Sequence, residues 1–575
     1  MSITGTSAAT GNMQRISFWI RIRNVWGYVQ RGDISGLLAR LSHHRREAYM
    51  LQVRRRLQRR SKNVWGIITP PHTLFVAQTI ADRLAELEIS SEVMTKPPDF
   101  SDHDFYFVLG AQTFDHLPPG EKRIVFQLEQ SVSDRWFTDK YFSTLRNSVA
   151  TLDYSLTNIQ FLNDHNISYP HVHYLPIGAS STLIADHGEI EKEYDFLFYG
   201  DSYSSTRRRK MLDVLQAHFK VKICNEIFGD DMHDLIRKTR AVINLHYYEN
   251  ALLETPRIQE CLSLGVPLLS ETAQNQDEFP ELNGAVTFFE EGSIEAMLIA
   301  AREILDNIDT ATAQVAKSVA ASSKQFRFML DRFLVAIDAL PASHWQDNSI
   351  YLEWEDQPIS LSLPETIERR TIFNSSAHED CIIFDGIRHP LGWVGCGLSY
   401  KTLAMKALSH GLPQLTVFED DAIFTTDHTD KVEIVRRYLR SRAEPWDIFA
   451  GVIASVHPNT KILSVEELDG IAFVTIDHMT SMVYNIYNRS ALELLAQWDP
   501  MNTDPHTNTI DKFLENQTTV QVVVAVPFLV GHREEVQSTL WGFQNNTYSK
   551  MIAESEAKII TLARDWTDAR RTEDQ

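Results

Sequence analysis

The sequence predicts a multidomain α/β protein in which short apolar strands alternate with amphipathic helices. Three observations support this fold class. The chain has 575 residues, which is too long for a single core, so we expect two to four domains. Its 43% hydrophobic and 23% charged residues are typical of a folded chain. From Asn63 onward, apolar runs of four to six residues alternate with segments of helical periodicity, as in a doubly wound parallel sheet.

Composition excludes several classes of function. The formal net charge is -21, which argues against a general nucleic-acid binder, so no nucleic-acid partner is expected. The sequence shows neither an apolar run of about 20 residues nor a signal-peptide core. The four cysteines form no C-x-x-C pair and suggest neither a zinc site nor a disulfide framework. The expected location is the cytoplasm, with a peripheral position on the inner face of the membrane as a further expectation.

Residues 1–62 form a basic segment that differs from the rest of the chain. They carry 13 Arg and Lys residues against Asp33 and Glu47, a charge of about +11, which leaves about -32 for the remainder. Trp19, Ile20 and Trp26 lie among these charges. The pattern fits an amphipathic helix on an anionic membrane surface. The alternative is a pair of ordinary helices that pack on the acidic body of the protein.

The next two domains are expected at residues 63–190 and 191–340. In the first, strands are predicted at 64–68, 89–94, 105–109, 123–128, 148–155 and 171–175, with a helix at 73–88. In the second, strands are predicted at 195–199, 241–245 and 266–270, with helices at 207–218, 256–264, 293–307 and 311–339. Ligands of such sheets bind at the carboxyl ends of the strands.

A candidate phosphate site follows the strand at 195–199. Residues 200–206 are small and polar, and Arg207 and Arg208 begin the next helix. Backbone N–H groups, the helix dipole and cationic side chains can together hold a phosphate. The alternative is a turn before a solvated basic helix end. Glu260, on the helix that Pro256 begins, could accept two ribose hydroxyls, or it could be a surface acid.

This part of the chain resembles the nucleotide-binding half of the GT-B glycosyltransferases, in particular the group 1, CgeB-like branch. The resemblance is carried by Asp195-Phe-Leu-Phe-Tyr-Gly-Asp201, Ile243-Asn-Leu-His246 and the segment from Pro256 to Glu271. It implies that Glu260 faces the donor ribose and that Arg207 and Arg208 face the diphosphate. Many retaining members carry a second glutamate eight positions before the first, where this chain has Leu252.

After an expected linker at residues 341–358, a third α/β domain is predicted at 359–555, followed by a polar tail at 556–575. Its main feature is an apolar strand at 415–418 that ends in Glu419, Asp420 and Asp421. Three adjacent carboxylates repel one another unless a cation compensates them. Mg²⁺ or Mn²⁺ shared with a diphosphate would do so. The alternative is a solvated acidic turn.

The third domain closely resembles glycosyltransferase family 25, the lipooligosaccharide galactosyltransferases, which implies a GT-A fold. The resemblance is carried by the Arg369-Arg370 pair, the helix start Gly392-Trp-Val-Gly-Cys-Gly-Leu-Ser399 and the Glu419-Asp420-Asp421 strand end. It continues through Thr480–Leu495, Thr509–Leu514 and Val526–His532 to about residue 545. Many relatives have Gln where this chain has His532.

The predicted roles in this domain follow the chemistry of sugar transfer. A divalent ion at Asp421 and Glu419, with Asp420 beside them and His532 as a third ligand, would offset charge on the leaving diphosphate. Asp511 is the candidate general base, with a helix cap as its alternative. Arg369 and Arg370 would contact the nucleotide or form an ordinary surface pair. Gly397 and Ser399 are expected to shape the helix start.

The sequence therefore predicts a bifunctional glycosyltransferase with a GT-B-like pair of Rossmann-type domains, a GT-A-like domain and a basic helical N-terminal segment. The expected substrates are UDP-hexoses, galactose first for the last domain, and a lipid-linked or oligosaccharide acceptor of lipopolysaccharide or capsule. The alternative is a single transferase whose GT-B-like half binds the acceptor or has a structural role. A two-carboxylate hydrolase is a third reading, which would need no metal.

Overall fold

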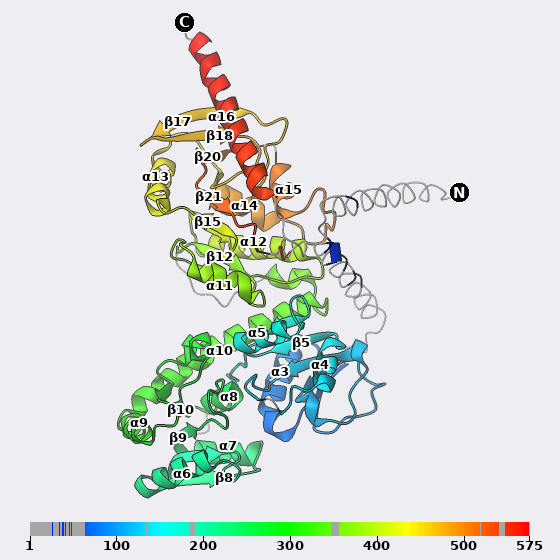
Figure 1. The fold of residues 1–575 in the computed structure, drawn as a ribbon, viewed down its shortest axis with the longest axis vertical. Coiled ribbons are helices and arrows are strands. Elements are labelled where there is room, and N and C mark those ends of the chain that lie inside the picture. The colour runs from blue at the N-terminus through cyan, green and yellow to red at the C-terminus, as the bar shows by residue number, and fades with distance from the viewer. Residues whose placement is uncertain are drawn as a thin grey trace, which may run out of the picture. The chain divides into compact units, whose positions relative to one another are not determined.

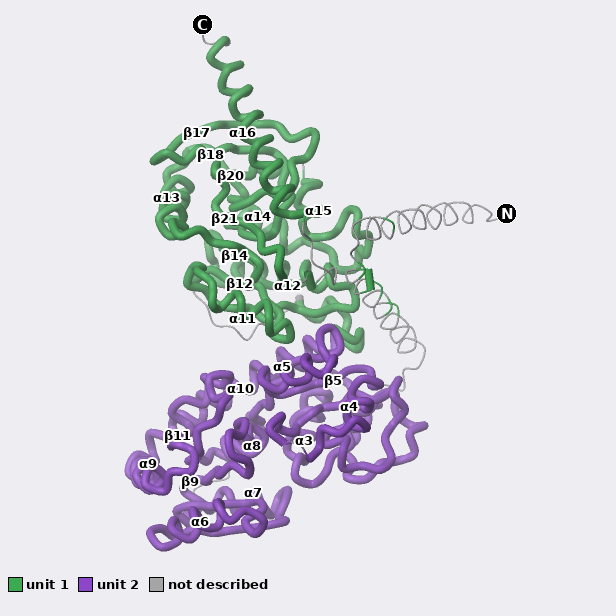
Figure 2. The backbone as a smooth tube through the Cα atoms, viewed as in Figure 1, with its two compact units in different colours: residues 1–54, 336–348, 354–575 green, residues 55–335, 349–353 purple. Residues whose placement is uncertain are grey.

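The computed structural model describes residues 64–133, 135–183, 190–346, 356–517, 519–536, 538–539 and 547–573, with isolated positions between 26 and 48. The predicted basic segment at 1–62 lies almost entirely outside the described residues, so its membrane contact stays a prediction. The chain divides into two compact units (Figure 2): unit 2 comprises residues 55–335 and 349–353, and unit 1 comprises residues 1–54, 336–348 and 354–575.

Unit 2, coloured blue to green in Figure 1, begins with a six-stranded, all-parallel sheet, here called sheet A. The strand order is β2-β1-β3-β4-β5-β6. Its strands are β1 (Val64–Ile68), β2 (Ser90–Met94), β3 (Phe105–Leu109), β4 (Arg123–Gln127), β5 (Ala150–Asp153) and β6 (Val172–Tyr174). Its helices are α3 (Leu74–Glu86), α4 (Asp139–Arg146) and α5 (Leu156–Asp164). Every residue of β3 and β4 is buried, as expected for apolar strands covered on both faces.

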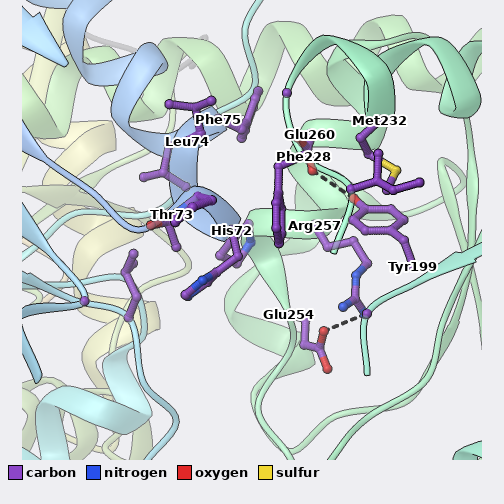
Figure 3. Close-up of a pocket in the computed structure, with 18 of the residues that line it drawn as sticks. His72, Thr73, Leu74, Phe75, Tyr199, Phe228, Met232, Glu254, Arg257 and Glu260 are labelled. Atoms are coloured by element: carbon purple, nitrogen blue, oxygen red, sulfur yellow. Dashed lines mark hydrogen bonds and ion pairs between the residues drawn. The ribbon is translucent and has the colours of Figure 1, made fainter. Parts of the chain in front are cut away.

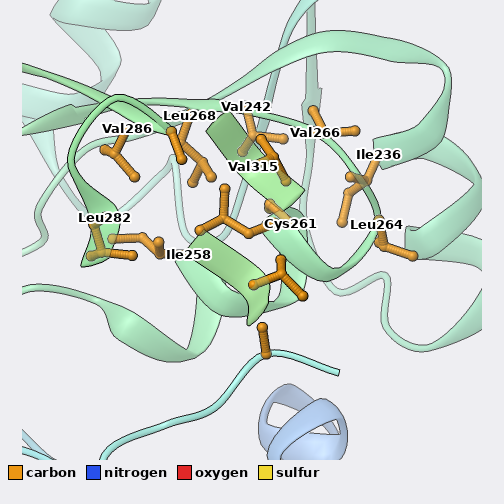
Figure 4. Packing of buried hydrophobic residues seen from close by; sticks show 14 of the residues in the cluster. Ile236, Val242, Ile258, Cys261, Leu264, Val266, Leu268, Leu282, Val286 and Val315 are labelled. Atoms are coloured by element: carbon orange, nitrogen blue, oxygen red, sulfur yellow. The ribbon is translucent and has the colours of Figure 1, made fainter. Parts of the chain in front are cut away.

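The second half of unit 2 is sheet B, also parallel, in the order β11-β10-β9-β7-β8. Its strands are β7 (Tyr194–Tyr199), β8 (Val221–Cys224), β9 (Thr239–Asn244), β10 (Leu268–Glu271) and β11 (Val286–Phe289). Its helices are α6 (Thr206–His218), α7 (Asp230–Arg237), α8 (Thr255–Ser263), α9 (Ile294–Asp306) and α10 (Ile308–Ala336). On one face, Ile236 of α7, Ile258 of α8 and Val315 of α10 pack over the sheet (Figure 4). The opposite face is covered by α6 and α9.

Polar contacts join the two halves of unit 2. The carboxylate of Glu278, from the sheet B half, accepts hydrogen bonds at the first turn of α5, from Leu156 N at 2.9 Å and Thr157 N at 2.9 Å. An anion at a helix N-terminus satisfies N–H groups that have no partner within the helix. Arg83 of α3 likewise donates from Nε to Asp331 of α10 at 2.9 Å. These contacts fix how sheet A faces sheet B.

Unit 1 contains sheet C, with eight strands in the order β13-β12-β14-β19-β16-β20-β18-β17. Its strands are β12 (Ile359–Ser362), β13 (Ile382–Asp385), β14 (Gln414–Glu419), β16 (Ile448–Ala450), β17 (Ile462–Leu468), β18 (Ile471–Ile476), β19 (Tyr484–Asn488) and β20 (Val522–Val526). A separate ribbon pairs β15 (Ala422–Phe424) with β21 (Val530–His532). The helices are α11 (Ile367–Ser375), α12 (Gly392–Ser409), α13 (His428–Ser441), α14 (Arg489–Gln497), α15 (Ile510–Glu515) and α16 (Tyr548–Glu573).

The predicted fold class is confirmed: the two parallel Rossmann-type sheets of unit 2 are followed in the chain by the mixed α/β sheet C of unit 1. The predicted boundary at 555/556 falls inside α16, so the described part of the expected polar tail is helical. The same helix continues the body of unit 1, because Ser555 and Lys558 donate to the carbonyl groups of Ala454 and Val456. Among the described residues, no helix has the length and apolar character needed to cross a bilayer.

Candidate active site

Unit 2 contains a cavity of about 1110 Å³ where the carboxyl ends of sheets A and B face one another. From sheet A it is lined by the residues after β1, β3, β4 and β5, and from sheet B by those after β7, β8 and β9. Figure 3 shows His72, Thr73 and Leu74 on one side of this space and Tyr199, Arg257 and Glu260 on the other. This is the position at which open α/β sheets bind ligands.

The sheet B wall lies at the point where the strand order reverses, between β7 and β9. Gly200 follows β7 with a φ of +126°, a conformation that favours glycine. A Cβ built there would lie 3.0 Å from Nη2 of Arg257. The missing side chain therefore allows the guanidinium to approach the backbone of the 200–206 loop closely.

Two arginines and a glutamate form an ion-pair cluster in this wall. Glu254 lies between them, 2.6 Å from Nη1 of Arg257 and 3.1 Å from Nη2 of Arg208. Burial opposes the charged form of Glu254, but the charges of Arg257 and Arg208 outweigh it and hold its pKa below the usual value. Arg208 also donates to the carbonyl oxygens of Leu245 and Asp201, so it joins the 200–206 loop to the end of β9.

Glu260 lies one helical turn beyond Arg257 on α8 and lines the same cavity. Tyr199 donates its hydroxyl to Oε2 of Glu260 at 2.9 Å, and Nε2 of His233 lies 3.2 Å from Oε1 (Figure 3 draws the first contact). The carboxylate is thus oriented on both oxygens before any ligand arrives. Glu260 therefore lies in the wall of a cavity, and its role at a donor site and its contact with a ribose remain predictions.

The structure separates the two predicted phosphate arginines. Arg208 lines the cavity, whereas Arg207 is not among the lining residues. Arg207 donates to the carbonyl of His246 at 3.0 Å and forms an ion pair with buried Glu271, which closes the end of β10. Sequence reasoning assigned no role to Arg257 or Glu254. Their spacing of three residues across the start of α8 was the signal available.

The predicted acidic site lies in unit 1, at the carboxyl end of β14. Here β12 pairs in parallel with both β13 and β14, so the strand order reverses at this point as well. Arg369 of α11 donates from Nε to Asp420 Oδ1 at 3.1 Å and from Nη2 to Asp421 Oδ2 at 3.0 Å. Ser362, at the end of β12, donates to the other oxygen of Asp420 at 2.7 Å. The alternative of a solvated acidic turn is wrong, because Asp420 and Asp421 are buried.

Asp421 and His532 are brought together by the β15–β21 ribbon, in which Ala422 pairs with His532. Nε2 of His532 lies 3.4 Å from Oδ2 of Asp421. Oδ1 of Asp421 and Nδ1 of His532 are both buried without a hydrogen-bond partner among the described residues. These two atoms are therefore available to a ligand.

Negative charge accumulates around Glu419. Burial and the neighbouring charge of Asp421 raise its pKa to about 8, against the effect of Arg369, and Asp511 adds to the shift. The pKa of the Cys396 thiol is raised by burial and then by Glu419 and Asp511. Since Asp511 acts on both groups, the predicted acids at 419, 421 and 511 lie near one another.

Asp511 occupies the first turn of α15, where its Oδ1 accepts a hydrogen bond from Lys512 N at 2.9 Å. The residue at the cap position itself is Thr509. The other predicted nucleotide residue, Arg370, donates to Asp385 at 2.6 Å and is thereby held beside β13. The hydrogen bonds of Asp511 with Lys512 and of Arg370 with Asp385 do not involve Asp420 or Asp421, the two acids that Arg369 binds.

The residues around Asp421 fit a divalent cation in their chemistry. Oδ1 of Asp421 and Nδ1 of His532 are buried without a hydrogen-bond partner among the described residues, and a cation could bind both. A cation would also stabilise the ionised form of Glu419, whose pKa is raised beside the other acids. Within the described ranges, however, no three His, Cys, Asp or Glu side chains already form a group that could hold a metal. Metal binding would require Asp421 to share its charge between Arg369 and the ion.

The start of α12 has a structural explanation. A Cβ on Gly397 would lie 2.4 Å from the ring of Trp498, and one on Gly395 would lie 2.6 Å from the carbonyl oxygen of Ile387. Ser399 Oγ accepts from Ile387 N at 2.8 Å and donates to Gly395 O at 2.9 Å. These contacts agree with the expectation that Gly397 and Ser399 shape the helix start.

Comparison with known proteins supports the assignment of sheet B. A family model described as glycosyl transferase-like matches residues 183–328. These residues include all of sheet B and most of the helices around it. Arg208, Glu254, Arg257 and Glu260 all lie within the matched residues.

Curated relatives match other fractions of the chain. An uncharacterized protein, L140, of Acanthamoeba polyphaga mimivirus is 31% identical over 24% of this chain and 46% of its own length. The probable inactive glycosyltransferase 25 family member 3 of Rattus norvegicus is 25% identical over 38% of this chain and 40% of its own length. The chain thus spans less than half of these curated relatives.

Solved structures show weak likeness over about half of the chain. The Anabaena protein HepE, in complex with UDP and glucose, has 12% identity and a TM-score of 0.36, with coverage of 48% of this chain and 100% of the Anabaena chain. A sucrose-phosphate synthase from Thermosynechococcus elongatus has 11% identity and a TM-score of 0.33, with coverage of 48% and 99%.

Proposed function

We propose that this protein is a glycosyltransferase whose unit 2 transfers a sugar from a nucleotide-sugar donor to an acceptor hydroxyl. The observation that carries the proposal is the 1110 Å³ cavity with Arg208, Glu254, Arg257 and Glu260 in one wall. The two arginines lie beside a glycine loop at the end of β7, where a diphosphate meets both backbone N–H groups and cations. The glycosyl transferase-like match of residues 183–328 supports it.

Each side chain of this wall has a role in the proposed donor site. Glu260, oriented by Tyr199 and His233, accepts the ribose hydroxyls. Arg257 offsets the charge that develops on the diphosphate as the sugar leaves. Its Nε is buried without a hydrogen-bond partner among the described residues, so this donor is free for a phosphate oxygen. Glu254 keeps both arginines in place.

Unit 1 is proposed as a second, family 25-like transferase module with a UDP-hexose donor, galactose first. A divalent ion held at Asp421, Glu419 and His532 would supply Lewis-acid stabilisation of the departing diphosphate. Asp511 would take the proton of the acceptor hydroxyl. The proposed acceptor is a surface glycan such as lipopolysaccharide or capsule, reached by a peripheral membrane position.

One observation favours a single activity instead. Unit 2 has Leu252 where many retaining GT-B enzymes have a second glutamate, and Leu252 is fully buried. In that case unit 2 binds the acceptor or has a structural role, and unit 1 alone catalyses transfer.

The test is UDP release by the full-length chain with a panel of UDP-hexoses, with Mn²⁺ or with chelator. Glu260→Gln and Asp421→Asn are compared with the exposed-acid controls Glu295→Gln and Asp430→Asn. Bifunctionality predicts that each site variant removes turnover of one donor and that chelator removes only the Asp421-dependent part. Turnover that survives Glu260→Gln unchanged, with every donor, would contradict the role of unit 2.

A further inference from the structure

Glu129, the second residue after β4, lines the sheet A side of the cavity, opposite the donor wall. Glu129 is half-buried and lines the cavity that also contains Arg257 and Glu260. We propose that Glu129 is the general base that takes the proton from the acceptor hydroxyl, so that unit 2 transfers sugar with inversion at the anomeric carbon. This inference rests on the proposed function of unit 2 and adds to it an acceptor side and a stereochemical outcome.

The backbone of Glu129 is held rigidly. The side-chain amide of Gln127, which is fully buried, accepts from Glu129 N at 2.6 Å and donates to Glu129 O at 2.7 Å. Asn158 of α5 donates to the same carbonyl oxygen at 2.8 Å. Two buried amides thus fix where the side chain leaves the strand, as catalytic geometry requires.

The carboxylate itself is only partly engaged. Gln112 donates to Oε1 of Glu129 at 2.6 Å, and the described residues offer Oε2 no hydrogen bond. Burial raises the pKa of Glu129 above its ordinary value, although Gln112 and the charge of Arg135 act against the shift. A carboxylate with one free oxygen and a raised proton affinity is suited to accept a proton.

Direct contacts place Glu129 next to the donor wall. The neighbouring Gln130 accepts a hydrogen bond from Leu252 N at 3.0 Å, and Ser133 donates to the hydroxyl of Tyr248 at 3.0 Å. The 129–133 loop therefore touches the 247–254 segment of sheet B. Tyr154 lines the same cavity, and burial, followed by the charges of Asp153, Glu254, Glu278 and Glu129, raises its pKa.

The proposed step balances as follows. The acceptor oxygen forms a bond to the anomeric carbon while Glu129 takes the hydroxyl proton. The bond from the anomeric carbon to the diphosphate oxygen breaks, and its electron pair leaves with the nucleoside diphosphate beside Arg257. Attack comes from the sheet A side and departure toward sheet B, so the configuration at carbon inverts. An inverting transfer of this kind does not require the second glutamate that many retaining members carry at the position of Leu252.

The test uses the full-length chain with an Asp421→Asn background, which removes the contribution of the second proposed centre. Glu129→Gln is compared with His72→Gln, another cavity residue on the sheet A side that is able to accept a proton, and with Glu121→Gln, an exposed acid before β4. We expect Glu129→Gln to lower kcat by about 10²- to 10⁴-fold while the Kd for UDP changes by less than about threefold. The Glu121 variant should match the parent.

Two further readouts separate a base from a structural residue. Azide attacks without losing a proton, so it should restore turnover of Glu129→Ala as a glycosyl azide of inverted configuration, detected by proton NMR. The acid limb of the kcat/KM profile of the parent should disappear in Glu129→Gln. Full kcat in Glu129→Gln, loss only in His72→Gln, or retention of configuration would overturn the proposal. If the parent neither binds UDP nor turns over a UDP-sugar, the proposed function of unit 2 fails first.

Discussion

Nη2 of Arg369 lies 3.0 Å from Oδ2 of Asp421, and the same guanidinium also binds Asp420. The candidate metal site of unit 1 therefore already contains a cation that is part of the protein. One arginine cannot neutralise all the carboxylates nearby, as the pKa of about 8 at Glu419 indicates. The site is thus held together by Arg369 and left with an excess of negative charge.

Removing Arg369 should destabilise unit 1 strongly. Arg369→Ala leaves two buried carboxylates without their partner, which costs about 3 to 5 kcal/mol in the free energy of unfolding. Urea denaturation of the full chain, followed by a probe in unit 1, measures the loss. Arg437→Ala, which breaks an exposed ion pair with Asp469, is the control and should cost about 1 kcal/mol or less. Equal effects of the two variants would contradict the structural role of Arg369.

Adding Mn²⁺ should stabilise unit 1. A ligand that binds only the folded state at 100 times its Kd adds about 2.7 kcal/mol. Differential scanning calorimetry with Mn²⁺ and with chelator detects the shift in Tm. Asp421→Asn should abolish the shift, and His532→Gln should reduce it, because each removes a proposed ligand. A shift of the same size in Asp421→Asn would place the ion elsewhere.

Removing the hydroxyl of Tyr199 should weaken donor binding. Tyr199→Phe deletes the 2.9 Å hydrogen bond that orients Glu260 and leaves the aromatic ring in place. A hydrogen bond to a charged group contributes about 1.5 to 3 kcal/mol, and His233 still holds the other oxygen, so we expect the Kd for UDP to rise about 3- to 10-fold. Isothermal titration calorimetry gives the value. Tyr194→Phe, at the opposite end of β7 and outside the cavity lining, should leave the Kd unchanged.

The contribution of His428 to the stability of unit 1 should fall as pH drops below neutrality, whereas Glu419, whose pKa burial raises to about 8, contributes in the opposite direction. Burial, and then the charge of Arg436, lowers the pKa of His428 from 6.5 to about 4. Its position at the start of α13 also disfavours a cation. Because the unfolded state binds the proton first, the stability that the neutral ring provides is complete above pH 6.5 and is lost as pH falls toward 4. The difference in Tm between the parent and His428→Gln should shrink as pH falls through this window, because the variant lacks this contribution at every pH. The difference between the parent and the partly exposed His457→Gln should stay constant.

Local sequence patterns predicted most of unit 2 because its parallel strands are apolar throughout. The strand at 64–68 is found as β1, and the strand predicted at 195–199 is β7, one residue longer. Strand β2 mixes polar and apolar residues. Strand β8 has only four residues, one of which is Lys222, so it was not predicted. Partly exposed edge strands of this kind have little apolar periodicity.

The candidate sites depended on contacts that no local pattern contains. The role of Arg369 came from its neighbours Asp420 and Asp421, which are about 50 positions away in the chain and meet it only because β12 pairs with β14. Glu254 was given no role from the sequence, yet two arginines from different helices converge on it. Glu129 directly follows the strand predicted at 123–128, and no local pattern marks it, because its importance follows from the opposing wall.

The hydrogen bonds between Glu278 and the first turn of α5 limit how the cavity can open. A hinge motion that swung sheet A from sheet B would pull this carboxylate away from Leu156 N and Thr157 N and leave it without its charged hydrogen bonds. It would also break the contact of Gln130 with Leu252. Substrate entry and product release in unit 2 should therefore depend on small displacements of the rim loops, with slow amide exchange at Leu156 and Thr157 even during turnover.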